Sequence, residues 1–593
     1  MKRFASSRVS SAAAFARCFS APVTGTSGTE ESWYLDMWRR LVFPSQDSTL
    51  SRGEFDSSNS STTPMEPRHF LRAAGNHLPD GAVNGLWELY HSIHEDDKAS
   101  QFFVSVSRCG PDLDRVRSHQ SKLMEVTAAY EQACKADVGD KQRQSAEKSF
   151  MKAVAAMDES ATPICERWFR QSTALPNGIR WMMDLRRRLL HTITNTEKAF
   201  AAAKQAPEAK DALLETVLYD LKSLDERLLS SFKEFFAKQY LLLEELTWKT
   251  TSPYVLERVI ASEAVHPFPP GGLDSMKLRI RGGLEVPLDN THQRHLFALY
   301  HPAVADEPLV SIQVSLCSGI ENSVDRILNR PTPLQGKEEA SHNVQKKQPH
   351  PAPLKDTAIF YSINNAQPSL KGIELGSMLI KRVVSSITTQ PYKYVDPLTN
   401  APHPITQFST LSPMPGFMRW LAAETSKLER GLPHRIFGST DAETTSRHFS
   451  ELKAAIGGGD MTHEQIMFVV LNMFSDSNEF THRTPNHLWY WNDELTSALK
   501  APMMRSAAAY LVEEKRRGNM LDPVGNFHVG NGAIVHRINW LANCSEKGSS
   551  ESACIMVNYR YDLRMLGENS TKYALEHTVA VGDDIKNMLG ATA

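Results

Sequence analysis

The spacing of apolar residues changes near Trp248, and this change most limits how the chain can fold. Over residues 65–250, apolar side chains recur every three or four positions, which predicts amphipathic helices. After Trp248, short apolar runs alternate with helical segments, which is typical of an α/β domain. Because 593 residues exceed one ordinary domain, we expect an α+β multidomain protein. Its first unit is an all-α helical bundle over 65–250, and its second is an α/β domain over 251–593.

Particular apolar runs support this division. One stripe in the helical half comprises Leu213, Val217, Leu221, Leu224 and Leu228. In the second half, strands are expected at 295–300, 308–316, 357–363 and 407–411. Helices are expected at 373–384 and 417–428, and insertions near 330–355, 390–406 and 438–460. The apolar stripes of the helical half exceed what one small bundle needs to bury, so we expect a homo-oligomer.

Composition argues against several classes of protein. The 66 Lys and Arg side chains balance 68 Asp and Glu side chains, for a net charge of −2, which gives no support to a nucleic-acid or membrane-surface partner. The seven Cys include no C-x-x-C pair, so we expect neither a disulfide framework nor a zinc site. The longest apolar stretch, Ile466–Phe474, is interrupted by Asn472 and is too short to span a bilayer.

The first twenty residues have the composition of a mitochondrial transit peptide. They carry Lys2, Arg3, Arg8 and Arg17 among many Ser and Ala, and no acidic residue precedes Glu30. An unstructured basic tail is the alternative interpretation. We expect residues 1–20 to direct the chain to the mitochondrial matrix. Residues 21–64, which are rich in Ser, Thr and Gly, are expected to form a mostly mobile leader.

A glycine-bearing turn follows the strand expected at 357–363. Gly372 and Gly376 would let backbone N–H groups approach a pyrophosphate at the start of the next helix. The turn matches neither a Walker A loop nor a G-x-G-x-x-G motif. A purely structural strand–helix turn would carry the same glycines, so the residues alone leave both interpretations open.

Ser412 and His528 are the other candidates for chemistry. The strand that runs into Ser412 must stop there, because Pro413 and Pro415 cannot continue a hydrogen-bonded ladder. The Ser412 hydroxyl would then face a cleft at a strand end, although a capping or turn serine is equally compatible. His528 lies in a Gly- and Asn-rich segment over 521–533, which we expect to be a loop. A lone histidine there could also be structural.

Six motifs, taken in order, resemble one family. They are FYSI at 360–363, LKGIELG at 370–376, LSPMPGF at 411–417, EKRRGNMLDPVGNFHVGNGA at 514–533, RINWLA at 537–542 and MVNYRY at 556–561. Together they resemble malonyl-CoA decarboxylase, over roughly residues 65–590 apart from the insertions. The resemblance implies a catalytic domain with the GNAT acyltransferase fold, used for decarboxylation. It also implies that the N-terminal helices assemble dimers or tetramers.

The resemblance further implies a site. The family's catalytic serine and histidine fall on Ser412 and His528, and further active-site positions fall on Ser362, Glu374 and Tyr561. The stretch that binds the CoA phosphates falls on Lys371, Gly372, Ile373, Glu374, Leu375, Gly376 and Ser377. The implied substrate is malonyl-CoA and the implied products are acetyl-CoA and CO2.

Such a reaction agrees with these residue types and requires no cofactor. Loss of CO2 leaves an enolate that the thioester delocalises, so we expect no metal, biotin, pyridoxal phosphate or thiamine. The protein must hold the carboxylate out of the thioester plane, stabilise the enolate oxygen and supply a proton to carbon. Ser412 can orient the carboxylate, and a histidine with a near-neutral pKa can protonate the carbon. A GNAT-type acyl-CoA-dependent acyltransferase and a non-enzymatic helical assembly protein are the alternatives.

Overall fold

The computed structural model describes residues 30–42, 77–111, 113–135, 139–205, 212–238, 240–268, 271–280, 293–305, 307–331, 333, 355–389, 404–437, 442–475 and 489–590. The expected transit segment and most of the insertions near 330–355 and 390–406 lie outside these residues. The chain divides into two compact units, Met1–Lys238 and Gln239–Ala593. The boundary precedes residue 250, because strand β1 (Leu242–Glu245) pairs with the sheet of the second unit.

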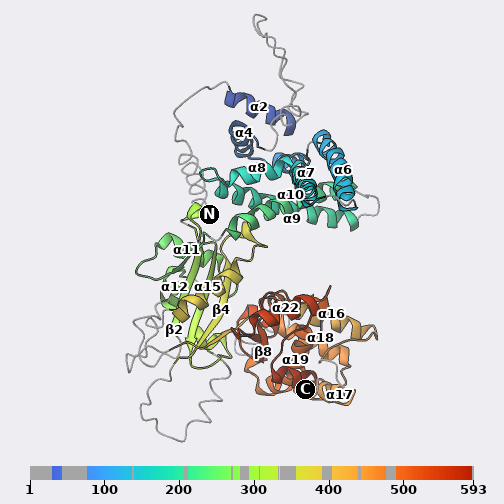
Figure 1. Cartoon of the computed structure of the whole chain (residues 1–593). Coiled ribbons are helices and arrows are strands. Elements are labelled where there is room, and N and C mark those ends of the chain that lie inside the picture. Colours follow the sequence, from blue (N-terminus) through green and yellow to red (C-terminus); the bar gives the residue numbers. More distant parts are fainter. Residues whose placement is uncertain are drawn as a thin grey trace, which may run out of the picture. The chain divides into compact units, whose positions relative to one another are not determined.

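The described part of the first unit is helical (Figure 1). Its helices are α2 (Glu30–Val42), α4 (Asp80–His91), α5 (Asp96–Ser107), α6 (Leu113–Lys135), α7 (Asp140–Ala161), α8 (Ile164–Ser172), α9 (Gly178–Gln205) and α10 (Ala212–Ala237). Helix α2 lies within the segment expected to be a mobile leader, so that expectation is wrong for residues 30–42. Trp38 of α2 is fully buried, and its indole N–H donates to Ala82 O at 2.7 Å.

The apolar stripe of α10 packs into the first unit over most of its length. Leu221, Leu224 and Leu228 are fully buried, which stabilises the unit by about 1.5–3 kcal/mol for each side chain. Leu213 is instead 68% exposed, because it lies in the first turn of the helix, before the packed face begins. Helices α6 and α7 pack mainly against each other, and α6 buries no residue.

The second unit is built on a mixed seven-stranded sheet with the order β1-β2-β3-β4-β5-β9-β8. Its other strands are β2 (Gln293–Tyr300), β3 (Val310–Cys317), β4 (Thr357–Asn365), β5 (Gln407–Thr410), β8 (Ile534–Asn539) and β9 (Met556–Arg560), and β6 (Lys515–Arg516) and β7 (Asn519–Met520) form a separate hairpin. The β4–β5 pair is parallel, whereas the other neighbours are antiparallel. The four strands expected from apolar runs are therefore confirmed.

Helices cover the sheet and follow its strands. They are α11 (Pro253–Ser262), α12 (Leu273–Ile280), α13 (Val324–Ile327), α15 (Leu375–Thr389), α16 (Phe417–Glu429), α17 (Ala442–Ala455), α18 (His463–Phe474), α19 (Asp493–Val512), α20 (Pro523–Gly530), α21 (Glu546–Ser552), α22 (Leu566–Glu576) and α23 (Asp583–Leu589). The helices expected at 373–384 and 417–428 are α15 and α16. Helix α17 occupies most of the expected insertion near 438–460 and packs against α18 and α19. No described helix is long and apolar enough to cross a bilayer.

Two clusters of the core of the second unit lie on the same face of this sheet, where Arg294 of β2 donates to Leu278 O of α12 and to Ile327 O of α13. Alternate residues of β2, namely Leu296, Ala298 and Tyr300, pack with α11 and α12. Near the opposite edge, Tyr361, Leu411 and Met556 pack with α13 in a second cluster. All eight residues of β3 are buried, as expected for a strand in the middle of a covered sheet.

Candidate active site

The parallel strands β4 and β5 diverge at their carboxyl ends, and Ser412 lies at this divergence. Their ladder ends at Phe360, whose carbonyl accepts from Leu411 N at 3.0 Å. The next residue pairs with β9 instead: Ser412 N donates to Val557 O at 2.9 Å, and Val557 N donates to Ser412 O at 2.8 Å. Because Leu411 packs with α13, the Ser412 side chain projects from the other face of the sheet. The carboxyl ends of diverging parallel strands are a common place for ligand sites.

Helix α20 carries His528 to that face. Asp522 caps the helix by accepting from Gly525 N at 2.7 Å, and Pro523 occupies its first turn. The imidazole of His528 stacks on Tyr559 of β9, with ring centroids 4.7 Å apart. Only 3% of His528 is exposed. The expected loop over 521–533 is therefore wrong, and His528 is held rigidly between a short helix and the sheet.

Two side chains, Ser412 and Tyr561, lie within hydrogen-bonding distance of the ring nitrogens of His528. Ser412 Oγ lies 3.2 Å from His528 Nε2 and also donates to Thr410 Oγ1 at 3.0 Å. On the other side of the ring, Nδ1 lies 2.7 Å from the hydroxyl of Tyr561. Because the one Ser412 proton is directed at Thr410, His528 donates from Nε2 and accepts the Tyr561 proton at Nδ1. This chain fixes the tautomer of His528, with its N–H facing Ser412.

Burial sets the charge of His528. Desolvation lowers the pKa of His528 to about 3, because a low-dielectric site disfavours the charged imidazolium. Burial also raises the pKa of Tyr561, so its hydroxyl keeps the proton that it donates. The expected near-neutral pKa of His528 is therefore wrong for the free protein. The resting site holds a neutral imidazole.

The expected phosphate-binding stretch lies next to α20. Gly372 has φ +91°, a conformation that favours glycine, and α15 starts at Leu375. A Cβ on Gly376 would lie 3.3 Å from the ring of Phe527, the residue before His528. Ser377 Oγ donates to Asn531 Oδ1 at 2.5 Å. The N-terminus of α15 and the helix that carries His528 are therefore packed together.

Comparison with known proteins identifies the family. The family model of the malonyl-CoA decarboxylase C-terminal domain matches residues 239–593, more than half of the chain. The chain belongs to the malonyl-CoA decarboxylase family. The mitochondrial malonyl-CoA decarboxylase of Anser anser anser is 30% identical over 416 residues, which are 70% of this chain and 66% of that protein. That of Mus musculus is 30% identical over 423 residues, which are 71% of this chain and 70% of that protein. Proteins with this name are carboxy-lyases.

Two crystal structures show the same fold. Malonyl-CoA decarboxylase from Rhodopseudomonas palustris aligns with a TM-score of 0.56 and 23% identity, over 94% of this chain and 99% of that chain. The protein of that name from Agrobacterium vitis aligns with a TM-score of 0.55 and 24% identity, over 86% of this chain and 95% of that chain.

Two of the residues expected to be catalytic in a malonyl-CoA decarboxylase lie apart from the Ser412–His528–Tyr561 chain. Ser362 Oγ donates to both carboxylate oxygens of Glu263, at 2.8 and 2.9 Å. Glu374 is exposed, just before α15 begins. Lys371 and Gly372 are exposed too, whereas Leu375 and Ser377 are buried. The expected set is therefore divided between a buried hydrogen-bonded chain, a buried carboxylate contact and an open helix N-terminus.

The sequence interpretation missed several residues that hold this candidate site together. Thr410 accepts from Ser412, and Tyr559 stacks on His528. Glu263 bonds Ser362, and Asn531 bonds Ser377. Thr410 and Tyr559 each lie two residues from a site residue, on the same face of an extended segment. Side chains two residues apart in a strand point to the same face, and this alternation was the sequence signal that could have identified Thr410 and Tyr559.

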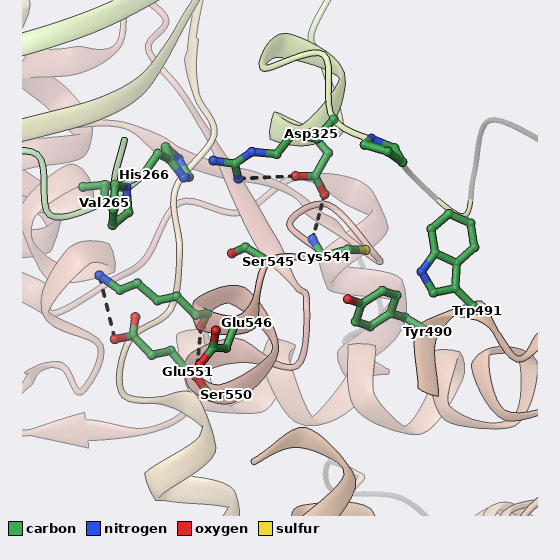
Figure 2. A pocket seen from close by; sticks show the side chains of 14 residues that line it. Val265, His266, Asp325, Tyr490, Trp491, Cys544, Ser545, Glu546, Ser550 and Glu551 are labelled. Carbon is green, nitrogen blue, oxygen red and sulfur yellow. Dashed lines mark hydrogen bonds and ion pairs between the residues drawn. The ribbon is translucent and has the colours of Figure 1, made fainter. Parts of the chain in front are cut away.

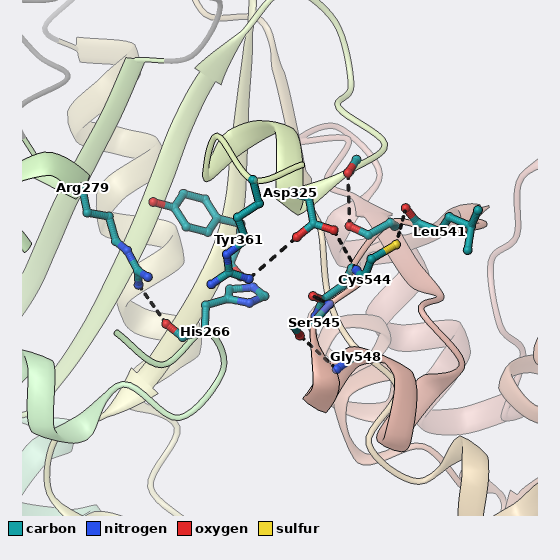
Figure 3. A network of polar contacts seen from close by, with 12 residues as sticks. His266, Arg279, Asp325, Tyr361, Leu541, Cys544, Ser545 and Gly548 are labelled. Atoms are coloured by element: carbon teal, nitrogen blue, oxygen red, sulfur yellow. Dashed lines mark hydrogen bonds and ion pairs between the residues drawn. The ribbon is translucent and has the colours of Figure 1, made fainter. Parts of the chain in front are cut away.

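A separate pocket lies on the α13 side of the sheet (Figure 2). We call it the α13 pocket; it has a volume of about 720 Å³, and its lining includes His266, Asp325, Arg330, Tyr490, Cys544 and Lys547. None of the expected site residues lines it. Figure 3 shows the polar contacts beside it, where Asp325 accepts from Cys544 N at 2.7 Å and Arg330 forms an ion pair with Asp325.

Proposed function

We propose that this protein is an active malonyl-CoA decarboxylase that converts malonyl-CoA to acetyl-CoA and CO2. The observation that carries the proposal is the chain from Tyr561 through His528 to Ser412, at the divergence of β4 and β5. Family membership supports the reaction, and the hydrogen-bonded chain supplies suitable chemical groups. No metal or organic cofactor is required, because the thioester of the substrate stabilises the enolate.

The first step is orientation of the carboxylate. In this proposal the Ser412 hydroxyl and the Nε2–H of His528 donate to the malonyl carboxylate and hold it out of the thioester plane. Ser412 is 7% exposed, so these hydrogen bonds form with little competing water. Each preorganised donor in such a site typically lowers the activation free energy by about 3–4 kcal/mol.

The second step is protonation of the enolate carbon. A carboxylate bound beside Nε2 raises the pKa of His528, because a nearby negative charge stabilises the imidazolium. In the free enzyme Tyr561 keeps Nε2 as the protonated nitrogen by donating to Nδ1. In the substrate complex Nδ1 takes up one proton from solvent and donates it to the Tyr561 oxygen, which gives the imidazolium. Loss of CO2 moves the negative charge onto the enolate, and the Nε2 proton then passes to carbon and leaves a neutral imidazole. His528 is thus neutral in the free enzyme and becomes an acid only with substrate.

The CoA phosphates are assigned to the start of α15. Backbone N–H groups of the first helical turn have no intrahelical partners and attract anions. Lys371, Gly372 and Glu374 are exposed there, and Gly376 packs against the helix that carries His528. The parallel β4–β5 pair, with α15 between its strands, supports a GNAT-like catalytic domain.

The proposal also includes the oligomeric state of the protein and its location in the cell. Exposed Leu113, Met124 and Met151 on the α6–α7 hairpin support a homo-oligomer formed by the helical unit. The family's mitochondrial members support a matrix location. Residues 1–20 should carry a fused reporter into mitochondria, and a reporter that stays in the cytosol would refute the address.

The decisive experiment measures acetyl-CoA and CO2 from malonyl-CoA, with no amine acceptor present. Protein lacking residues 1–20 should release both products in equal amounts. Ser412→Ala and His528→Asn should each slow single-turnover release by about 10²- to 10³-fold, with much smaller changes in CoA-thioester affinity. Tyr361→Phe, which removes a buried hydroxyl bonded to Gln313 at 3.0 Å, is the matched control and should leave the rate intact. Product formation that requires an amine would favour the acyltransferase instead.

A further inference from the structure

Cys544 gives the α13 pocket a thiol (Figure 2). It follows β8, and its backbone N–H is fixed by Asp325 Oδ2 at 2.7 Å. Its Sγ makes a weak contact of 3.7 Å with Leu541 O (Figure 3). The residue is half-buried. A small polar oxidant in the pocket can therefore reach this sulfur, although the backbone around it is held in place.

A second cysteine lies directly behind the first. Cys554, which precedes β9, is fully buried, and its thiol lies within interaction distance of that of Cys544. Its carbonyl accepts from Ala542 N at 2.8 Å and from Asn543 N at 3.2 Å, and its own N–H donates to Gly548 O at 2.9 Å. The loops before and after α21 are therefore joined at these two residues.

The backbone of both loops is strained. Leu541, Ala553 and Cys554 have φ values of +51°, +50° and +60°, which are uncommon for residues other than glycine. Close packing holds them in place, because a Cβ on Gly548 would lie 2.2 Å from Asn543 O. Strained positions of this kind gather at functional and switch sites. Here they comprise Cys554 itself, its neighbour Ala553, and Leu541, whose carbonyl contacts Cys544 Sγ.

We propose that Cys544 and Cys554 are a peroxide-oxidised modification site that closes to an intramolecular disulfide at the α13 pocket. In the first step, the Cys544 thiolate attacks hydrogen peroxide, the O–O bond breaks, and Cys544 sulfenic acid and water form. In the second step, the Cys554 sulfur attacks the sulfenic sulfur, the S–O bond breaks, and the disulfide and a second water form. Overall, two thiols lose two hydrogens and two electrons to one peroxide, which becomes two waters.

The environments of the two thiols assign their roles. Desolvation raises the pKa of Cys554 and keeps it a thiol, so the pocket-facing Cys544 reacts first. Cys554 is then the resolving group. The second step is expected to be the slower one, because Cys554 is a thiolate in only a small fraction of the protein molecules at any moment. A disulfide has an S–S length of about 2.05 Å, so the two neighbouring sulfurs must move closer together when the bond forms.

The test treats the full chain, fully reduced, with dilute hydrogen peroxide, blocks remaining thiols, and maps cysteine peptides by mass spectrometry. The expected result is a linked peptide pair containing Cys544 and Cys554, lighter by two hydrogens and split by reductant. Cys554→Ser should instead accumulate Cys544 sulfenic acid, trapped by dimedone several-fold more than in the unaltered protein. If Cys554→Ser does not fold, Cys554→Ala serves the same purpose.

Two control variants complete the design. Cys544→Ser should leave Cys554 a thiol that is alkylated only after unfolding. Cys134→Ser, which removes an exposed thiol of the first unit, should form the same Cys544–Cys554 disulfide as the unaltered chain. Conversion of Cys544 to sulfinic acid while Cys554 stays reduced would overturn the proposal. So would an unmodified Cys544 at a peroxide dose that oxidises Cys134.

Discussion

Replacing Tyr561 by Phe removes one hydroxyl and tests how His528 is held. The Tyr561 hydroxyl lies 2.7 Å from His528 Nδ1, and both residues are buried. Without it, Nδ1 in the active tautomer has no donor, which costs about 1–3 kcal/mol for a buried acceptor. The ring can escape this cost by moving its proton to Nδ1, which turns a lone pair toward Ser412. If the whole cost falls on the barrier, turnover drops by about 5- to 150-fold.

The assay is single-turnover acetyl-CoA formation from malonyl-CoA, beside thermal melts of the same preparations. Tyr361→Phe is the matched control, because it also removes one buried hydroxyl with one hydrogen bond of 3.0 Å. Both variants should lose stability to a similar extent, and only Tyr561→Phe should lose rate. A folded Tyr561→Phe protein with turnover within about twofold of the unaltered protein would show that the tautomer is not set by Tyr561.

Other consequences of the structure can be measured directly. The double variant Ser412→Ala with His528→Asn should be little slower than the slower single variant, since residues that act as a unit are non-additive; multiplied losses would separate their roles. The kcat/KM profile should show no ionisation near pH 6.5 from His528, because burial lowers its pKa to about 3 in the free enzyme; a limb there that His528→Asn abolishes would contradict this. Burial raises the pKa of Asp522 from 3.8 to about 6, so its contribution to the unfolding free energy should fall as pH rises from about 4 to about 6, where the folded state binds more protons. Asp522→Asn should remove that slope in urea titrations, and an unchanged slope would refute the assignment. Replacing both Leu221 and Leu228 by Asp should disrupt the helical unit by burying unpaired charge, which would be measured as a loss of helical circular dichroism. Light scattering of the unaltered protein should show an oligomer, and a monomer would refute that prediction.

Local patterns predicted the frame of the fold. Apolar runs located β2 to β5 because buried strands need continuous or alternating apolar residues. Two prolines correctly ended the strand at Ser412, since proline lacks the N–H that a ladder needs. The pairing of Ser412 with His528 joins positions 116 residues apart. The spacing of apolar residues cannot predict a contact between such distant positions, so only the family resemblance predicted that Ser412 and His528 lie together.

Helix α20 shows where pattern reasoning failed. Eight residues rich in Gly and Asn have little helix propensity, so the segment was expected to be a loop. The missed signal was Asp522-Pro523, an N-cap followed by proline in the first turn. The burial of His528 against Tyr559 could not be predicted locally, because it depends on β9, and the lowered pKa of His528 follows from that burial alone.

The exchange of partners at Ser412 has a consequence for how the enzyme loses activity on heating. Among the described residues, β5 and β9 share one ladder pair, Ser409 with Arg560, and the bridge from Ser412 to Val557. Three further hydrogen bonds join the same segments, from Tyr561 N to Phe408 O, from Asn558 Nδ2 to Thr410 O and from Tyr559 N to Thr410 Oγ1, so the contact has few ladder pairs for its length. Such a seam separates two blocks of well-paired strands and should open in local fluctuations before either block melts. The amide of Ser412 should then exchange with solvent deuterium faster than those of β3. If Ser412 has the proposed role, inactivation should precede unfolding, because the first hydrogen bonds to break are those that position its hydroxyl.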